Sequence, residues 1–257
     1  MPDHLTNRRR KEIASLRQKK YRDELAEMLV EGKRSVEAAL NAAAPLKDIV
    51  VAHSVATTPD IRQITDRATV PVYVVPDADI EGFSAVETSQ GILAVVAIDA
   101  DASLDLRATS MILALDGLQD PGNVGTLIRT AAWFGIDAVA TAPGTVDMYH
   151  PKVVRAAMGA LWDLRRARLD DLPAWLAECK REGFGVYGAD LHGIDVRDWR
   201  PAGKSVLVLG SESHGISPVV AALLDERIVV RGGGQRRGTE SLNVAVAAGI
   251  LMYAWVS

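Results

Sequence analysis

Short apolar runs alternate with mixed apolar and polar stretches through the first hundred residues. Short apolar runs predict β-strands, and apolar positions at helical spacing predict α-helices. We expect helices at residues 33–40, 60–66 and 77–83, and strands at residues 49–52, 72–75 and 92–97. Because strands and helices alternate, this part is expected to form a small α/β layer.

The same alternation restarts near residue 110, now with strands that are apolar along their whole length. Such runs are typical of a parallel sheet that is covered on both faces. The expected strands are residues 111–115, 138–141, 185–189, 206–210 and 227–230, and the expected helices are residues 126–134, 151–161, 172–181 and 218–224. A polar, acidic stretch at residues 99–105 is the expected linker. We therefore predict an α/β protein with one domain at residues 1–100 and a second, parallel-sheet domain at residues 108–257.

A final helix is predicted after Asn243, where twelve residues in succession are almost all apolar. Because it is apolar on every face, the helix is expected to be buried, and it is too short to span a bilayer. Ser241 or Thr239 is expected to cap it. The glycine-rich loop at residues 231–238 is a candidate ligand site, although the pattern alone favours a surface loop before a core helix.

Composition limits the possible partners. With a formal charge of −4 over 257 residues, any contact with nucleic acid has to come from local patches. Residues 8–22 carry eight basic side chains against Glu12 alone, which fits phosphate contacts and a solvated helix face equally well. Cys179 is the single cysteine, so no intrachain disulfide forms and a reducing cytoplasm fits. The first residues lack the apolar stretch of a signal peptide.

Three strand-end loops carry the candidate chemistry. In an open parallel sheet, ligands bind beyond the carboxyl ends of the strands. The first loop leads to Asn123 and Arg129, the second holds Glu212, and the third holds Ser241 and Asn243. Together these side chains could orient a hydroxyl nucleophile and a phosphate.

Several other motifs are incomplete. The glycines at residues 122–125 lack the order of a dinucleotide fingerprint, which disfavours a nicotinamide-dependent dehydrogenase. Residues 233–238 have phosphate-loop spacing, but Thr239 stands where the lysine belongs. Residues 211–215 miss the nucleophile elbow because they begin with serine. The five histidines and one cysteine have no zinc-ligand spacing, so no metal is expected.

Three segments, in this order and at this separation, resemble the SpoU (TrmH) family of RNA ribose 2′-O-methyltransferases in the knotted SPOUT class. They are DPGNVGTLIRTA at residues 120–131, LGSESHGIS at residues 209–217 and ESLNVAVA at residues 240–247. PKVVRAAMGA at residues 151–160 is also similar to a family segment. Residues 1–100, with KYR at 20–22, LVEG at 29–32 and QGILAVV at 90–96, resemble the family's substrate-binding domain, which is similar to small ribosomal RNA-binding proteins.

The resemblance implies S-adenosylmethionine as the methyl donor, a deep trefoil knot near the C-terminus and a homodimer with its sites at the interface. It implies an RNA substrate, 23S ribosomal RNA in particular, with transfer RNA or a non-catalytic RNA-binding role as alternatives. A non-catalytic relative would be marked by loss of Asn123, Arg129 or Asn243, and none is lost. No membrane or DNA partner is expected, and the expected location is the cytoplasm.

Site residues follow from the resemblance by position. The catalytic positions are Asn123, Arg129, Glu212, Ser241 and Asn243. The donor-binding positions are Leu209, Gly210, Ile216, Ile228, Val230, Ser241 and Leu242. The chain departs from the family around residues 228–238, where a longer, arginine-containing loop replaces the usual proline-containing strand end. Because a guanidinium stays protonated in proteins, we expect Arg129 to clamp a phosphate and the developing alkoxide rather than act as a base.

Overall fold

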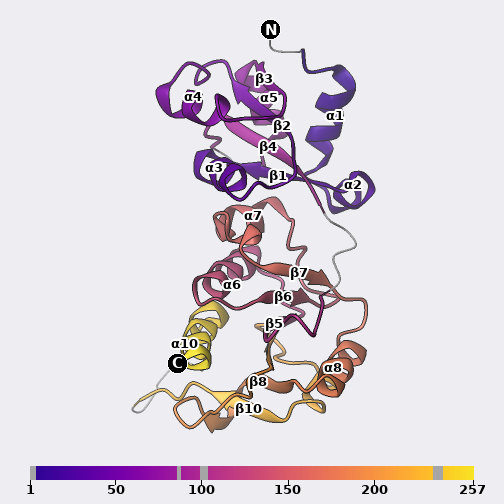
Figure 1. The fold of residues 1–257 in the computed structure, drawn as a ribbon, viewed down its shortest axis with the longest axis vertical. Helices are drawn as coiled ribbons and strands as arrows, with labels where there is room; N and C mark the ends of the chain where they lie inside the picture. Colours follow the sequence, from indigo (N-terminus) through magenta and orange to yellow (C-terminus); the bar gives the residue numbers. More distant parts are fainter. Residues whose placement is uncertain (1–3, 86–87, 99–103, 234–239) are drawn as a thin grey trace. The chain divides into compact units, whose positions relative to one another are not determined.

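The computed structural model describes residues 4–85, 88–98, 104–233 and 240–257. The chain forms two compact units (Figure 1). Unit 1 comprises Met1–Asp101 and Asp147–Asp163, and unit 2 comprises Ala102–Val146 and Leu164–Ser257. The expected linker lies largely outside the described residues, and the domain limits inferred from the sequence stay a prediction. Each unit is described by itself.

Unit 1 is built on a mixed sheet, which has four strands in the described residues, in the order β1-β4-β2-β3. Its elements are α1 (Asn7–Ser15), α2 (Lys19–Leu25), β1 (Glu27–Glu31), α3 (Lys33–Asn41), β2 (Leu46–Ala52), α4 (Pro59–Thr65), β3 (Val72–Val75), α5 (Asp77–Phe83), β4 (Ile92–Ala97), α7 (Pro151–Ala157) and the 3-10 helix η1 (Ala160–Trp162). Strands β1 and β2 both pair antiparallel with β4, and β2 pairs parallel with β3. On one face, Leu29, Val50 and Leu93 pack with Ile13 of α1 and Ile80 of α5.

The segment 147–163 belongs to unit 1 although it follows β6 in the chain. Helix α7 packs against β1, and the side chains of Arg22 and Asp147 form a buried ion pair with an Nη2–Oδ2 distance of 2.7 Å. Gly159 adopts φ +93°, and a Cβ atom there would lie 2.4 Å from the Cβ of Ala38. Both the backbone conformation and the close approach therefore require glycine at this position.

Unit 2 holds a parallel sheet with six strands in the described residues, in the order β10-β8-β9-β5-β6-β7. Its elements are β5 (Met111–Asp116), α6 (Pro121–Trp133), β6 (Ala138–Thr141), β7 (Arg165–Arg168), α8 (Leu172–Arg181), β8 (Gly185–Asp195), β9 (Ser205–Gly210), α9 (Pro218–Ala221), β10 (Glu226–Val229) and α10 (Val244–Val256). The predicted α/β class, with a parallel sheet in the second half of the chain, is confirmed. Helix α10 packs along α6 (Figure 1).

Several local features differ from the predictions, among them strand β1, which was not predicted, and helix α9, which ends at Ala221 rather than at residue 224. Helix α6 begins at Pro121 rather than at residue 126, because the Asp120 carboxylate caps it by accepting a hydrogen bond from the backbone N–H of Asn123 at 2.7 Å. Helix α7 ends at Ala157 rather than at residue 161, because Met158 adopts a left-handed conformation. Strand β7, with the sequence RRAR, was not predicted because it carries no apolar run.

Two expectations for α10 are also wrong. Its cap is Asn243 rather than Ser241, and Thr239 lies outside the described residues. The helix is buried on one face only: Val246 is 54% and Tyr253 63% exposed, whereas Leu251 and Met252 are buried. Among the described residues, no helix has the length and apolar character needed to cross a membrane.

Candidate active site

The loops after β5, β9 and β10 leave the same edge of the parallel sheet, because the carboxyl ends of parallel strands lie together. Strands β5 and β9 are neighbours. From β5 the chain continues to β6 on one side, whereas β8 and β10 lie on the other side of β9. The strand order thus reverses at β5, which is where open α/β sheets bind ligands.

A chain of side-chain hydrogen bonds joins the three loops. Asn123, in the first turn of α6, donates through Nδ2 to Oε1 of Glu212 at 2.8 Å. Asn243 donates through Nδ2 to Oδ1 of Asn123 at 3.1 Å. The Oδ1 atom of Asn243 in turn accepts from the backbone N–H of Ala245 at 2.9 Å, which caps α10. The hydrogen bonds therefore join residues that are 89 and 120 positions apart in the sequence. In both asparagines the amide nitrogen donates one hydrogen bond and the amide oxygen accepts one.

The loop after β9 folds back tightly on its own strand. A Cβ atom at Gly210 would lie 2.1 Å from the carbonyl carbon of Gly215 and 2.2 Å from the nitrogen of Ile216, so only glycine fits. Ser211 and Gly215 pair across the turn, and Asp116 accepts a hydrogen bond from the backbone N–H of Ser217 at 2.8 Å. These contacts fix the position of Glu212 between the two ends of the turn.

The remaining predicted residues surround this chain of hydrogen bonds. Ser241 and Leu242 are exposed and directly precede Asn243, and Ile216 is half-buried. Leu209 and Ile228 are buried near the carboxyl ends of β9 and β10, and Val230 is half-buried just beyond β10. Residues 234–239 of the preceding loop lie outside the described residues.

Arg129 is exposed on α6, six residues after Asn123. At about 100° per residue, this spacing turns its side chain roughly 120° around the helix axis from Asn123. Arg129 therefore lies on a different side of α6 from the hydrogen-bonded asparagine. A ligand that contacts both residues would have to extend around the start of the helix.

Sequence reasoning missed two acidic residues that shape the site. Asp120 caps α6 and so sets the position of Asn123, and Asp116 holds the loop after β9 through Ser217. The first had a recognisable signal, since an Asp-Pro pair is typical of an N-cap followed by proline at the first helical position. The second had none, because its partner lies 101 residues away.

Over the described parts of the chain, no group of three or more histidine, cysteine, aspartate or glutamate side chains is arranged to hold a metal ion.

The basic run at residues 8–22 is largely neutralised by the fold of unit 1. Five of its eight basic side chains form ion pairs with acidic partners: Arg8 with Glu12, Arg9 with Glu12, Glu27 and Asp48, Arg10 with Asp79, Lys19 with Asp23, and Arg22 with Asp147. Burial alone would lower the pKa of Arg9, but its bonds to Glu27 and Asp48 raise that pKa above its usual value. Within the described residues, no ion pair is seen for the exposed side chains Lys11, Arg17 and Lys20. Among the described residues, these three are therefore the members of the run without an acidic partner.

Comparison with known proteins adds two family matches and several relatives. Residues 110–253 match the SpoU rRNA Methylase family, and residues 7–94 match the MRM3-like substrate binding domain. The chain is 33% identical over 248 residues to the 23S rRNA (guanosine(2553)-2′-O)-methyltransferase RlmP of Bacillus subtilis, covering 96% of this chain and 95% of that protein.

Solved structures agree with these matches. A TrmH-family protein from Porphyromonas gingivalis superposes with a TM-score of 0.86 at 36% identity, covering 98% of both chains. An AdoMet-bound rRNA methyltransferase from Sinorhizobium meliloti superposes with a TM-score of 0.81 at 27% identity, covering 97% of this chain and 94% of that one. With the family model spanning more than half of its length and a relative matching nearly all of it, this chain belongs to the SpoU rRNA methylase family, whose members are RNA methyltransferases that use S-adenosylmethionine.

Proposed function

We propose that this protein transfers a methyl group from S-adenosylmethionine to a ribose 2′-oxygen of ribosomal RNA, 23S RNA in particular. The named activity of the Bacillus subtilis relative supports the substrate and the position of methylation. The match of residues 7–94 to a substrate binding domain supports an RNA partner.

The observation that carries the proposal is the hydrogen-bonded chain of Glu212, Asn123 and Asn243. It holds one carboxylate and two amides at the edge of the sheet where ligands bind, and all three come from the segments that carry the family resemblance. Glu212 and Asn243 are exposed and Asn123 is half-buried. Polar side chains that hold one another in place can orient a ribose without first having to be ordered.

The residues present fit the donor. Leu242 is 45% exposed and Ile216 half-buried, so apolar side chains stand beside the polar groups of Glu212, Ser241 and Asn243. A ligand with an apolar ring system and a charged amino-acid end requires both kinds of surface. We assign donor binding to Leu209, Gly210, Ile216, Ile228, Val230, Ser241 and Leu242. When bound, the donor supplies the methyl group.

The catalytic roles are assigned by chemistry. Glu212, Asn123 and Asn243 would align the ribose, and Ser241 would add a hydroxyl next to Asn243. Arg129 would hold the neighbouring phosphate and stabilise negative charge as it develops on the 2′-oxygen. A guanidinium is protonated throughout the accessible pH range, so this role requires no titration of Arg129.

The test is methylation of 23S ribosomal RNA and of transfer RNA by the purified protein with labelled S-adenosylmethionine, followed by mass spectrometry of the nucleosides. The expected product is a 2′-O-methylnucleoside at one position of 23S RNA. Methylation of transfer RNA alone would overturn the substrate, methylation of a base would overturn the position, and no product on either RNA would overturn both.

A single substitution tests the role of the hydrogen bonds that link Glu212, Asn123 and Asn243. Asn243→Asp keeps an oxygen that can cap α10 but cannot donate to Asn123, so we expect normal folding and a rate at least about tenfold lower. Asn41→Asp is the matched control, because it makes the same chemical change at an exposed position of unit 1. Equal rates for the two variants would show that the hydrogen bonds linking Glu212, Asn123 and Asn243 play no part in the mechanism.

We further propose that two copies of the chain associate through the exposed side of α10. Val246, Ile250 and Tyr253 are exposed there, and Trp133 at the end of α6 is 85% exposed. The ring of Tyr253 contacts Phe134, which follows Trp133 (centroids 6.3 Å apart), so the apolar residues of both helices adjoin. Apolar side chains gathered in this way are typical of a protein interface, and a second copy is the occupant that the family resemblance implies.

Sedimentation velocity tests the dimer. The protein is expected to sediment as a dimer, and Tyr253→Asp is expected to yield monomers that keep the helix content of the parent. A parent that is monomeric at tens of micromolar would overturn this proposal. The trefoil knot and the cytoplasmic location stay predictions.

A further inference from the structure

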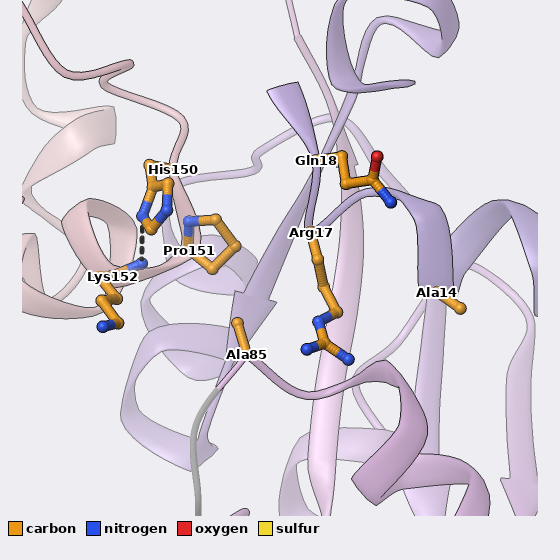
Figure 2. A pocket seen from close by; sticks show the side chains of 7 residues that line it. All are labelled: Ala14, Arg17, Gln18, Ala85, His150, Pro151 and Lys152. Atoms are coloured by element: carbon orange, nitrogen blue, oxygen red, sulfur yellow. Dashed lines mark hydrogen bonds between the residues drawn. The ribbon is translucent and has the colours of Figure 1, made fainter. Parts of the chain in front are cut away.

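A surface pocket of about 510 Å³ lies in unit 1, whereas the hydrogen-bonded chain of Glu212, Asn123 and Asn243 belongs to unit 2. It is lined by Ala14, Arg17, Gln18, Ala85, His150, Pro151 and Lys152. Figure 2 shows that three stretches far apart in the sequence line it: the end of α1 with the turn after it, Ala85 beyond α5, and the start of α7.

The polar atoms of this pocket are suited to an anion. Arg17 and Lys152 are exposed cations, Gln18 carries an amide, and no carboxylate lines the pocket within the part of the chain that the structure describes. Two acidic residues beside the lining residues are engaged in other contacts. Asp147 is paired with Arg22, and buried Glu31 accepts hydrogen bonds from Ser84 Oγ at 2.7 Å and from the backbone N–H of Ala85 at 2.8 Å.

His150 adds a neutral donor. Its Nδ1 accepts a hydrogen bond from the backbone N–H of Lys152 at 3.2 Å, so the ring proton resides on Nε2. Burial, and then the charge of Arg22, lower the pKa of His150 below its ordinary value, which keeps the ring uncharged at neutral pH. The positive charge of the pocket therefore comes from Arg17 and Lys152.

This arrangement also explains the basic run. Most of its basic side chains are paired with acids of the same unit, whereas Arg17 has no ion pair in the described residues and lines this pocket. A single cation is a weak phosphate ligand, but an arginine and a lysine on opposite walls, with an amide and an imidazole N–H, provide several donors to one anion.

We propose that this pocket binds a phosphate group of the RNA strand, outside the site of methyl transfer. The inference rests on the proposed function in so far as RNA is the substrate. Its tests measure binding directly, so they remain interpretable if no methylation is detected.

The first test is the salt dependence of binding to a fluorescein-labelled single-stranded RNA, read by anisotropy. One phosphate contact on a single strand contributes about 0.7 to the slope of log K against log salt, which corresponds to roughly fivefold in affinity at about 0.1 M salt. The double variant Arg17→Ala, Lys152→Ala, which removes this one contact, is therefore expected to bind about fivefold more weakly with a slope lower by about 0.7. Its affinity for S-adenosylmethionine is expected to be unchanged.

The matched control is the double variant Lys47→Ala, Arg62→Ala. It removes the same two charges from exposed positions of unit 1, on β2 and α4. Buried Ile61 and Ile64 of α4 are not part of the core under α1 and α5, which places α4 away from the α1 side of the sheet. We expect the control to retain its RNA affinity within about twofold. An equal loss in both double variants would show that only total charge matters and would overturn the pocket.

Two further measurements distinguish binding of an RNA strand from binding of a free anion, and a loss of RNA binding from a loss of folding. Titration with inorganic phosphate is expected to give no saturable binding below about 10 mM, since one phosphate without its strand makes few contacts. Submillimolar phosphate binding that Arg17→Ala, Lys152→Ala abolishes, with RNA affinity unchanged, would overturn the assignment to RNA. In methylation assays the pocket variant should raise KM for RNA and leave kcat unchanged, whereas a drop in kcat alone would contradict a binding role.

Discussion

The ion pair between Arg22 and Asp147 leads to a sharp prediction for stability, because it connects two parts of unit 1 that are 125 residues apart. Arg22 is 1% exposed, and it donates through Nε and Nη2 to Oδ2 of Asp147 at 2.9 and 2.7 Å. Its third donor, Nη1, reaches the carbonyl oxygen of Leu16 at 2.8 Å. The perturbations are Asp147→Asn, Arg22→Met and the two combined.

The magnitude follows from burial. At 2.7 Å and an effective dielectric constant of about 20, the attraction is about 6 kcal/mol, and removing two ions from water costs several kcal/mol each. The intact pair therefore adds little net stability. Removing one partner leaves the other charge buried without compensation, so either single variant is expected to lose about 3–5 kcal/mol of unfolding free energy.

The double variant is expected to lose much less than the sum of the single losses, because neither charge remains. In Asp147→Asn the amide oxygen can still accept from the backbone N–H of Tyr149, as Oδ1 does at 3.2 Å in the parent. The coupling free energy between the two positions is thus expected to be about 3 kcal/mol, of the size found for strongly interacting neighbours.

Urea unfolding with peptide-resolved hydrogen exchange is the assay. Peptides from residues 4–30 and 147–163 should lose protection in the single variants, whereas peptides from β5 and β9 of unit 2 should not. Additive losses in the double variant, or single losses below about 1 kcal/mol, would refute the assignment of a buried, coupled pair.

Three other outcomes are expected. Arg129→Ala should reduce turnover by about 10²-fold with donor affinity unchanged, and Arg129→Lys should be nearly as slow because a point charge does not replace a planar clamp; recovery of the lysine variant at high pH would instead favour a base. Burial, with a further contribution from Glu178, raises the pKa of Cys179 to about 12 from 9.0. A thiol reagent at pH 8 should therefore react about 10³-fold more slowly with the folded protein than with the protein unfolded in urea. Comparable rates would contradict the burial of Cys179. Because the pKa of His150 is lowered in the folded state, its neutral form contributes stability that is present above about pH 6.5 and is lost as pH falls through the folded pKa. His150→Gln should therefore make the urea midpoint of unit 1 less dependent on pH below about 6.5. An unchanged pH dependence of that midpoint would contradict the lowered pKa.

The sequence predicted most of the strands that carry apolar runs, with β1 (EMLVE) as an exception, and it missed β7, which carries none. Strands such as β5 and β9 are apolar along their length, and they lie where the pattern placed them. Strand β7 is an edge strand of three arginines and one alanine, held by backbone bonds to β6, and a hydrophobic pattern carries no information about such bonds.

The candidate site was predicted as a set of residues but not as a geometry. The resemblance selected Asn123, Glu212 and Asn243, but nothing in the sequence showed that each amide bonds to the next. Asn243 also caps α10, so one side chain both begins the helix and contacts Asn123. Propensity alone could not separate it from Ser241 as the cap, since both residue types cap helices well.

Charge was the least predictable property. The run at residues 8–22 reads as almost purely basic, yet its main acidic partners are Glu27, Asp48, Asp79 and Asp147, which only the fold brings near. Conversely, the apolar composition of α10 predicts a helix buried on every face, whereas Val246 and Tyr253 are exposed.

The position of residues 147–163 has a consequence for modularity. This stretch lies inside the match to the SpoU methylase model, yet Met148, Val153 and Val154 are buried in the unit that contains the substrate-binding match. A recombinant chimera that exchanged only residues 1–100 between relatives would place a foreign sheet against this native stretch. The foreign segment would have to supply, by chance, counterparts of Arg22 and Ala38 that fit Asp147 and Gly159. Residues 1–100 can therefore be replaced only together with residues 147–163. If such joint replacement occurred among relatives, the two stretches should covary in sequence.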